Sequence, residues 1–259
     1  MAEVLAIANQ KGGVGKTTTA VNLAASLAVA EQRVLLVDLD AQAHATQGVG
    51  VARASVTKGT YEVLLGDVGL SDVILETEIP LLKLAPSTDD LAAAESELAA
   101  VEDRASRLGA AIDRVRDDFD FVLVDCPPSL GLLTLNAFTA ADAVLVPMIC
   151  EYYSLEGLSR LSGTIDRIRA GLNPRLRVSG VLFTMFDPRN NLAREVADEV
   201  RRHFHVYETV IPRNVRLAEA PSHGKPVILY DPASRGSHGY LSLARELLGV
   251  LPGPSSEAA

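Results

Sequence analysis

The sequence predicts a doubly wound α/β fold, in which a mostly parallel sheet is flanked by helices on both faces. Short apolar runs rich in valine, leucine and isoleucine recur along the chain, and helix-like stretches separate them. A glycine-rich segment also stands between the first apolar run and the first helical stretch. Ligands of such sheets bind at the carboxyl ends of the strands, and the polar motifs of this chain cluster there.

Six apolar runs are predicted to form the buried strands. Because helices cover both faces of a parallel sheet, its strands are continuously apolar rather than alternating. The expected strands are residues 4–8, 34–37, 81–85, 121–124, 143–147 and 178–186. A chain of 259 residues suits one large domain, which we assign to residues 1–250, with residues 251–259 as a flexible tail.

The stretch between Asp89 and Phe119 carries apolar residues spaced alternately three and four apart, which is a heptad-like pattern. A coiled coil would produce this pattern, and so would a helix or a helix pair packed on the sheet. Gly109 interrupts the seam and many of its positions are alanine. We therefore favour packed helices.

The glycine-rich segment reads KGGVGKTT and has the composition of a phosphate cradle. Its glycines allow backbone N–H groups to converge on phosphate oxygens, and the helix that follows adds the positive end of its dipole. We expect Lys16 to reach the β- and γ-phosphates of a nucleotide and the Thr17 hydroxyl to ligate Mg²⁺. Gln10 stands where the usual Walker A motif has its first glycine, so this is the deviant form with an additional lysine. The nucleotide-binding residues predicted here are Lys11, Gly12, Gly13, Val14, Gly15, Lys16, Thr17 and Thr18.

Three aspartates follow two of the predicted strands. Asp38 and Asp40 come after residues 34–37, and Asp125 comes after residues 121–124. An apolar run that ends in aspartate is typical of a Walker B element, which contacts Mg²⁺ through water. Because successive side chains of a strand point to opposite faces, Asp38 and Asp40, two residues apart, point to the same side. One would hold the water shell of Mg²⁺, while the other orients an attacking water.

Charge and cysteine usage limit the function classes. The net charge of −9 argues against a protein that coats nucleic acid over its whole surface. Residues 151–220 nevertheless contain eleven arginines against nine acidic residues, so either an arginine-rich face or an ordinary solvated helix surface is expected there. Cys126 and Cys150 sit among apolar residues, which predicts buried thiols in a reducing cytoplasm. Neither a signal peptide nor a membrane span is expected.

Several segments resemble the ParA/Soj family of chromosome-partitioning ATPases. They are residues 8–19, 34–42, 124–129, 151–157 and 211–222. The first is shared by the wider deviant Walker A group of P-loop NTPases, whereas the last is more particular to partitioning proteins. The resemblance implies a Mg²⁺-dependent ATPase of weak basal activity, with ATP and Mg²⁺ as cofactors, in the cytoplasm and associated with the nucleoid.

The resemblance also implies roles for single residues. Lys11 resembles the signature lysine that crosses an ATP-sandwiched homodimer to touch the partner's phosphates, and Glu151 resembles the acidic residue that faces it. The implied catalytic residues are Lys11, Lys16 and Asp40, with Asp40 positioning the hydrolytic water. The residues implied to bind adenine are Met185, Pro212 and Asn214. Those expected to bind Mg²⁺ are Thr17, Asp38 and Asp125, the two aspartates through water.

Family members bind double-stranded DNA without sequence preference as ATP dimers, and a ParB-type centromere-binding protein stimulates the hydrolysis that releases them. The basic residues in the corresponding segments of this chain are Arg189, Arg213 and Arg216. About three residues precede the first expected strand, so we expect no separate helix-turn-helix and no operator binding. The cargo, chromosome or plasmid, stays open.

Two other classes share the first motif. MinD-type cell-division ATPases carry a C-terminal basic amphipathic helix for the bilayer, whereas residues 251–259 contain two prolines and one acidic residue. Iron–sulfur proteins of the nitrogenase-reductase or cluster-carrier type need thiolates placed for a cluster, and neither Cys126 nor Cys150 fits that pattern. One departure from the partitioning family is Ala41, where proline is usual, which puts the stiffness of that loop in doubt.

Overall fold

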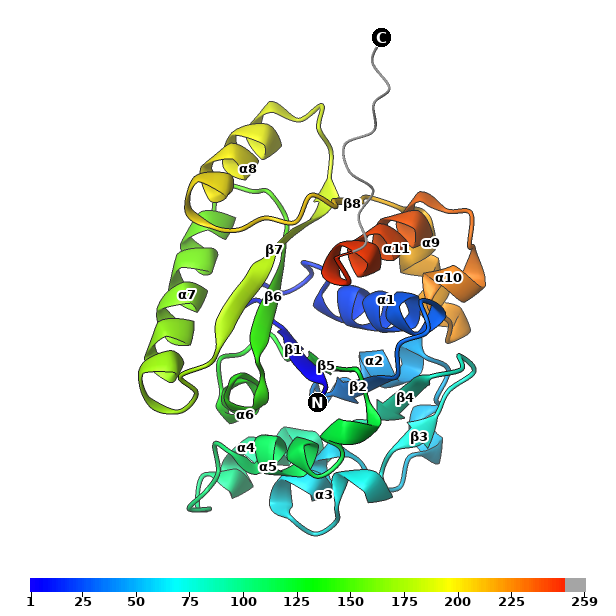
Figure 1. Ribbon diagram of the computed structural model, residues 1–259, viewed down its shortest axis with the longest axis vertical. Helices are drawn as coiled ribbons and strands as arrows, with labels where there is room; N and C mark the ends of the chain where they lie inside the picture. The colour runs from blue at the N-terminus through cyan, green and yellow to red at the C-terminus, as the bar shows by residue number, and fades with distance from the viewer. Residues whose placement is uncertain (250–259) are drawn as a thin grey trace.

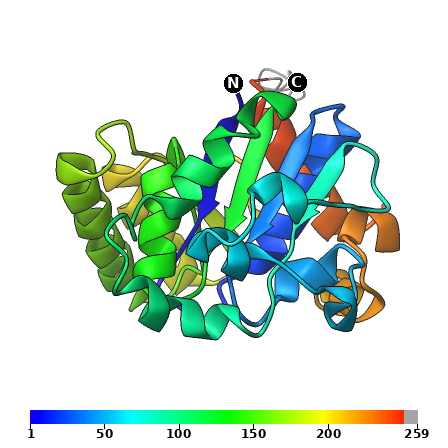
Figure 2. The same cartoon turned by 90° about the horizontal axis from the view of Figure 1, so that it is seen from below.

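The computed structural model describes residues 1–249, and its central element is an eight-stranded sheet. The strands are β1 Glu3–Ile7, β2 Val34–Asp38, β3 Leu75–Glu76, β4 Leu82–Ala85, β5 Phe121–Asp125, β6 Ala143–Met148, β7 Arg177–Phe186 and β8 Ile211–Pro212. Their order is β3-β4-β2-β5-β1-β6-β7-β8; β3 runs antiparallel to β4 and the other pairings are parallel. Figure 2 shows the central strands side by side. The predicted tail at residues 251–259 lies outside the described residues.

Helices cover both faces of this sheet (Figure 1). They are α1 Lys16–Val29, α2 His44–Gly48, α3 Thr60–Leu65, α4 Leu91–Leu98, α5 Arg107–Asp113, α6 Leu132–Ala140, α7 Ser154–Gly171, α8 Asn191–His203, α9 Val215–Glu219, α10 Val227–Tyr230 and α11 Arg235–Leu247. One hydrophobic core joins the sheet to α3 through α8, and a second joins it to α1, α2, α10 and α11. The predicted doubly wound α/β class is confirmed.

Strand residues alternate between the two cores. In β1, the side chains of Val4 and Ala6 belong to the first core. The second core takes Leu5 and Ile7, and all four side chains are buried. Because successive side chains of a strand point to opposite faces, a strand covered on both faces must be apolar at every position. This is why the buried strands appear in the sequence as continuous apolar runs.

Each of the six predicted strands is present, with ends that differ by one residue at most. Residues 75–76 and 211–212 form the additional strands β3 and β8. Two residues are too few to produce a hydrophobic period, so the sequence pattern missed both. The register of β8 against β7 is irregular between Thr184 and Phe186, which brings Pro212 beside the end of β7.

The heptad-like stretch forms two short helices rather than a coiled coil. Helices α4 and α5 are separated by residues 99–106. Their buried positions, all in the first core, are Leu91, Ala94, Leu98, Leu108 and Ile112. Gly109 lies on α5 where it faces Ala140 of α6, and a Cβ atom there would be at ordinary van der Waals distance, 3.5 Å from the Ala140 Cα atom. Packing on the sheet therefore explains the pattern.

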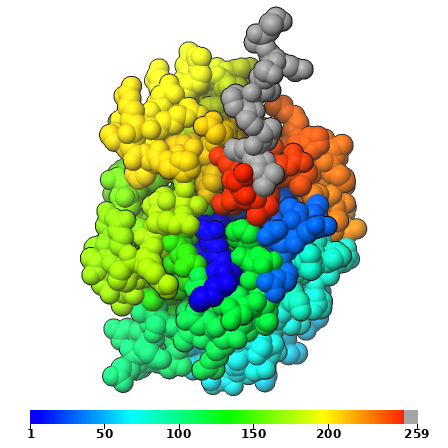
Figure 3. Space-filling view, viewed as in Figure 1, coloured from blue at the N-terminus to red at the C-terminus, as the bar shows by residue number. Residues whose placement is uncertain are grey.

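The topology brings several loops together at one end of the sheet. Strands β1 and β6 are neighbours in the sheet. From β1 the chain continues to β2 on one side of this pair, and from β6 it continues to β7 on the other side. Ligands of doubly wound sheets bind at the carboxyl ends of strands beside such a reversal. Figure 3 shows the face at which the chain begins, and the arrows of the central strands in Figure 2 point away from the end marked N. The candidate site lies at the carboxyl ends.

Both cysteines are free and buried, as predicted. Burial raises the pKa of the Cys150 thiol to about 12 and raises the pKa of the Cys126 thiol further. Burial therefore disfavours the thiolate, which is the nucleophilic form of cysteine. Within residues 1–249, no helix combines the length and the apolar composition that crossing a membrane requires.

Candidate nucleotide site

The glycine-rich loop connects β1 to α1 in a conformation that needs glycine. Gly13 has a φ angle of 73° and Gly15 a φ angle of 89°, which are values that L side chains rarely adopt. Gly15 stands at the N-cap of α1, and no side chain caps this helix end. The N–H groups of its first turn are thus available to an anion; phosphate binding there stays a prediction.

Two polar side chains that the sequence pattern did not single out hold this loop. Asn9 donates from Nδ2 to the Pro147 carbonyl at 2.8 Å and accepts from the Lys11 N–H at 3.0 Å. The Thr184 hydroxyl donates to the Val14 carbonyl at 2.8 Å. The ends of β6 and β7 therefore fix the loop that follows β1.

Lys16 is buried at the start of α1, with 8% of its surface exposed. Its ammonium donates to the Lys11 carbonyl at 3.2 Å. Burial lowers the pKa of Lys16, and the nearby Asp125 carboxylate opposes that shift. An ammonium has three N–H groups, so two remain for phosphate oxygens.

Asp125 is fully buried at the end of β5, and neither of its carboxylate oxygens has a hydrogen-bond partner. Burial raises the pKa of Asp125 well above its ordinary value and the neighbouring Asp38 raises it further. The Thr17 hydroxyl lies near enough to oppose the shift without making a hydrogen bond of good geometry. A buried carboxylate without donors is unfavourable, which makes it a natural partner for a cation or its water shell.

These groups fit the sequence prediction of a magnesium ion. Within residues 1–249, no group of three or more His, Cys, Asp or Glu side chains is arranged to hold a metal alone. Mg²⁺ keeps several waters and is usually held by one or two protein groups together with phosphate oxygens. The Thr17 hydroxyl and the Asp125 carboxylate beside the phosphate loop match that requirement.

The Asp38 carboxylate accepts hydrogen bonds from residues of its own chain. Its Oδ2 atom accepts from the Thr46 N–H and from the Thr46 hydroxyl, both at 2.7 Å, and its Oδ1 accepts from the Asp40 N–H at 3.2 Å. Burial raises the pKa of Asp38 to about 6, and the bonds from Thr46 oppose the shift. These contacts favour a role in holding residues 40–46; the predicted role at Mg²⁺ stays a prediction.

Asp40 lies on the loop between β2 and α2 and is partly exposed. Its Oδ1 atom accepts from the Gln42 N–H at 3.0 Å, and its own carbonyl accepts from the Ala43 N–H at 2.9 Å. Within residues 1–249, no protein group donates a hydrogen bond to its Oδ2 atom. This oxygen is available to a water molecule.

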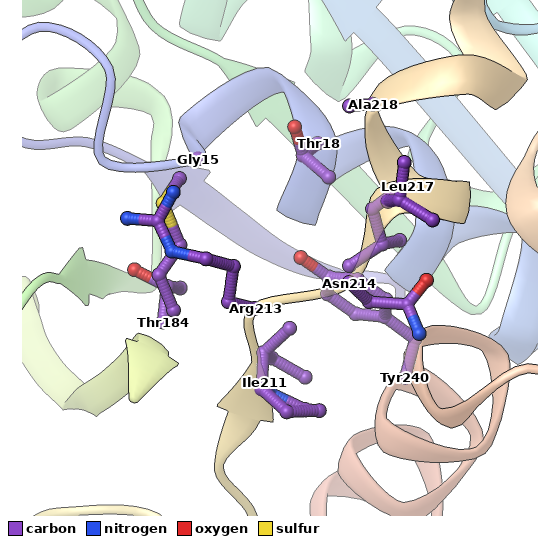
Figure 4. Close-up of a pocket in the computed structure, with 12 residues that line it drawn as sticks. Gly15, Thr18, Thr184, Ile211, Arg213, Asn214, Leu217, Ala218 and Tyr240 are labelled. Atoms are coloured by element: carbon purple, nitrogen blue, oxygen red, sulfur yellow. The ribbon is translucent and has the colours of Figure 1, made fainter. Parts of the chain in front are cut away.

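A cavity of about 400 Å³ opens beside the phosphate loop (Figure 4). Its lining includes Gly15, Thr18 and the three residues predicted to bind adenine, which are Met185, Pro212 and Asn214. Met185 has a φ angle of 51°, a strained value for a residue other than glycine. The Asn214 side chain accepts from the Arg216 N–H at 2.9 Å, so its amide N–H groups remain free for a ligand.

Apolar side chains from distant segments complete this cavity. Ile211, Leu217 and Tyr240 line it as well; Figure 4 shows Leu217 above Asn214, and Ile211 and Tyr240 below it. Tyr240 is buried on α11, and its hydroxyl lies 3.1 Å from that of Thr19 on α1. The sequence pattern missed these residues, because only the packing of α11 against α1 brings Tyr240 to the phosphate loop.

Lys11 and Glu151, which were predicted to face each other, form an ion pair within this chain. The Lys11 side chain is 37% exposed and the Glu151 side chain 56% exposed. Exposed ion pairs of this kind contribute about 0–1 kcal/mol. The contact therefore opposes a movement of Lys11 toward another charged group only weakly.

Arg189 lies just beyond the end of β7, and its side chain is 89% exposed. Its guanidinium forms a two-point contact with Asp187, which holds the pKa of that carboxyl down to about 2. Arg213 and Arg216 follow β8, the parallel neighbour of β7. The three predicted DNA-binding arginines are thus brought to the same edge of the sheet.

Arg213 and Arg216 have other contacts at this edge. Arg216 pairs with Glu219 at 2.7 Å and with Asp231 at 3.1 Å, so two carboxylates already compensate its charge. Arg213 lines the nucleotide cavity, and Figure 4 shows its side chain extending toward Gly15. Arg189 neither lines the cavity nor pairs with two carboxylates, so it is the arginine of this edge best placed for a macromolecular ligand.

Several known proteins are similar to this chain in sequence and fold. The sequence profile described as an AAA domain matches residues 2–178. The chain is 53% identical to chromosome partitioning protein ParA of Myxococcus xanthus, over 95% of this chain and 87% of the relative. It is also 53% identical to sporulation initiation inhibitor protein Soj of Bacillus subtilis, over 95% and 98%. A solved structure of cobyrinic acid a,c-diamide synthase from Mycobacterium smegmatis with ADP and magnesium is similar at 38% identity, with a TM-score of 0.84 and coverage of 96% and 94%.

We expect Asp125→Asn to stabilise the nucleotide-free protein at pH 7.5. Because the folded-state pKa of Asp125 is raised, the folded protein binds the proton more tightly than the unfolded chain. The Asp125 carboxyl group therefore does not reduce the free energy of unfolding near pH 4, where it is protonated, but reduces it increasingly as the pH rises. Removing this unpartnered buried charge should add about 1–3 kcal/mol to the free energy of unfolding at pH 7.5. Urea denaturation measures the gain.

The matched control for this prediction is Asp187→Asn. Asp187 is paired with Arg189 at the surface and its pKa is lowered to about 2, so removing its charge should not stabilise the protein at pH 7.5. The same comparison at pH 4.5 should give a smaller gain for Asp125→Asn. An Asp125 variant that is no more stable than the unsubstituted protein at pH 7.5 would contradict the assignment.

Proposed function

This chain belongs to the ParA/Soj family of chromosome-partitioning ATPases, and from that premise we propose that it hydrolyses ATP to segregate chromosome or plasmid copies. The observation that carries the proposal is a phosphate loop joined directly to a cavity lined by Met185, Pro212 and Asn214. The synthase named above matches at 38% identity and the partitioning proteins at 53%, so partitioning is the favoured activity.

ATP and Mg²⁺ are the proposed cofactors. The cavity would take the adenine, while the first turn of α1 and the Lys16 ammonium would hold the phosphates. Thr17 and the orphaned Asp125 carboxylate would hold the ion, which neutralises phosphate charge when bound. The solved structure from Mycobacterium smegmatis that contains ADP and magnesium supports this assignment.

Asp40 is proposed to orient the water that attacks the γ-phosphate. Its Oδ1 atom accepts from the Gln42 N–H, which leaves the Oδ2 atom to accept from the water. Catalysis by such a residue depends on how well its carboxylate is held. Weak basal activity follows if a partner protein is needed to complete this arrangement, and a ParB-type protein is the proposed partner.

We propose that ATP brings two chains together across their nucleotide sites. Lys11 would leave Glu151 and contact the partner's phosphates, where it would neutralise developing charge as an arginine finger does. The weakness of an exposed ion pair supports this exchange, because a phosphate carries more negative charge than a carboxylate.

Nonspecific DNA binding is proposed to follow dimerisation. Two chains would contribute two copies of the arginine edge around Arg189, which one acidic chain presents only once. Contacts from guanidinium groups to DNA phosphates release counterions and carry no sequence information. Hydrolysis would return the protein to the single chain and release the DNA. The proposed location is accordingly the nucleoid within the cytoplasm.

The dimer is tested with Lys11→Ala. The variant should still bind ATP, because Lys16 and the loop N–H groups remain, but it should sediment as a single chain with an ATP analogue that resists hydrolysis. Lys83→Ala is the matched control, since Lys83 pairs with Glu76 at the edge of the sheet away from the site. Lys16→Ala should lose nucleotide binding itself. Normal dimerisation of Lys11→Ala would refute the proposed role.

The hydrolytic role is tested with Asp40→Ala. Losing the group that orients the water should reduce the rate of ATP hydrolysis by a factor of about 10²–10⁴, with ATP binding retained. Rates are measured as phosphate release under single-turnover conditions. Asp117→Ala serves as the control, because Asp117 is exposed and lies before the amino end of β5. An unchanged rate for Asp40→Ala would shift the assignment to Asp38.

The DNA edge is tested with Arg189→Glu in the dimer formed with the same ATP analogue. The variant should bind all DNA sequences more weakly, and its log–log salt slope should fall by about 0.9 for each DNA phosphate that the arginine no longer neutralises. Arg175→Glu is the matched control, because Arg175 is exposed before the amino end of β7 and Arg189 follows its carboxyl end. Equal affinity and slope in both variants would exclude Arg189, and sequence-selective binding would exclude the nonspecific mechanism.

A further inference from the structure

We propose that Arg53 is a positioning residue for ATP hydrolysis, because it holds the peptide unit that orients the Asp40 carboxylate. This inference rests on the proposed role of Asp40 and extends it to a residue outside the phosphate loop. Arg53 does not line the nucleotide cavity. It acts on the reaction only through the backbone of the loop that carries Asp40.

Arg53 is the first residue of the short 3₁₀ helix η1, Arg53–Ser55, and its guanidinium contacts the loop at two carbonyl groups. Its Nη2 atom donates to the Ala41 carbonyl at 2.9 Å, and its Nη1 atom donates to the Gln42 carbonyl at 3.4 Å. The guanidinium also pairs with Asp89, which lies beyond the end of β4. The planar fork of arginine suits two adjacent acceptors, whereas lysine offers a single point of contact.

The contact at Ala41 reaches Asp40 through one rigid unit. The Ala41 carbonyl and the Gln42 N–H belong to the same peptide group, which is planar and does not rotate about its C–N bond. The Gln42 N–H donates to the Asp40 Oδ1 atom at 3.0 Å. A hydrogen bond from Arg53 at the carbonyl end therefore limits rotation of the N–H end, and the orientation of the carboxylate follows.

The loop's own hydrogen bonds, from the Asp40 N–H to Asp38 and from the Ala43 N–H to the Asp40 carbonyl, do not reach the carbonyls of residues 41 and 42, and the backbone there has little intrinsic stiffness. Alanine at position 41 leaves its φ angle free, whereas proline, which is usual in this family, would restrict it to about −65°. Ala43 adopts a φ angle of 52°, in the left-handed region that is unfavourable for an alanine. Both features weaken the intrinsic preference of the loop for the conformation that it adopts.

The other side-chain contacts of this segment hold its ends. Thr46 binds the Asp38 carboxylate, and the Thr60 hydroxyl donates to the Asp38 carbonyl at 2.9 Å. Within residues 1–249, Arg53 is the side chain that holds the carbonyls of residues 41 and 42, in the middle of the loop. Without the Arg53 side chain, the peptide group that donates to the Asp40 carboxylate is free to rotate.

The test compares Arg53→Ala, Arg53→Lys and Asp89→Asn for ATP hydrolysis by the full chain with Mg²⁺. Arg53→Ala should lower kcat by about 10- to 100-fold while KM for ATP changes less than twofold, because displacing a catalytic group by about 1 Å costs this much without affecting binding. Arg53→Lys, which can still reach one carbonyl, should recover part of kcat. Asp89→Asn leaves both hydrogen bonds to the loop and should keep kcat within twofold, although it removes the ion pair.

A double variant distinguishes positioning from a structural role. Adding Arg53→Ala to Asp40→Ala should cause no further loss of kcat, because the carboxylate that Arg53 positions is already gone. Additive losses, or a fall in kcat matched by an equal rise in KM, would overturn the inference. If Asp40→Ala itself hydrolyses ATP normally, the proposed function of Asp40 fails. If Asp40→Ala is slow while Arg53→Ala is not, only the role of Arg53 fails.

Discussion

The parallel pairing of β5 with both β1 and β2 is the constraint on which the site depends. In this register Asp125 stands opposite Ile7 on one side and Asp38 on the other. The phosphate loop follows Ile7, so the pairing brings the loop, the Walker B carboxylate and the loop of Asp40 to one edge. A slip by one residue would turn every side chain of a strand to the other face and bury the wrong groups.

The same register imposes a cost on the folded protein. Two carboxylates, Asp38 and Asp125, are fully buried side by side, and the Lys16 ammonium beside them is largely buried. Hydrogen bonds from Thr46 offset the cost of burying the Asp38 carboxylate, whereas the Asp125 carboxylate has no such bonds. The apolar strands that pack on both sides of the sheet offset this penalty, because they remove large areas of apolar surface from water. An unfavourable, unpartnered group at a ligand site gains its partner when the ligand binds.

The contacts that the proposed mechanism must break are all exposed. The Lys11–Glu151 and Arg189–Asp187 pairs lie in solvent, where an ion pair contributes little and exchanges readily for a phosphate. The contacts that must persist, such as the bond from Thr184 to the loop, are buried. Burial therefore separates the groups that move from the groups that hold the site.

Local chemistry was sufficient for the sequence to determine the six longer strands and the glycine-rich loop, since strand burial and left-handed glycines leave signals within a few residues. The tertiary structure alone decided that Asn9, Thr184 and Tyr240 hold or complete the site, because each acts on residues more than a hundred positions away or through backbone groups that no motif records. It also decided where the packed helices expected between Asp89 and Phe119 begin and end, and that Arg213 lines the cavity. A periodic pattern specifies which face of an element is apolar, whereas the partner of that face is chosen by the whole fold.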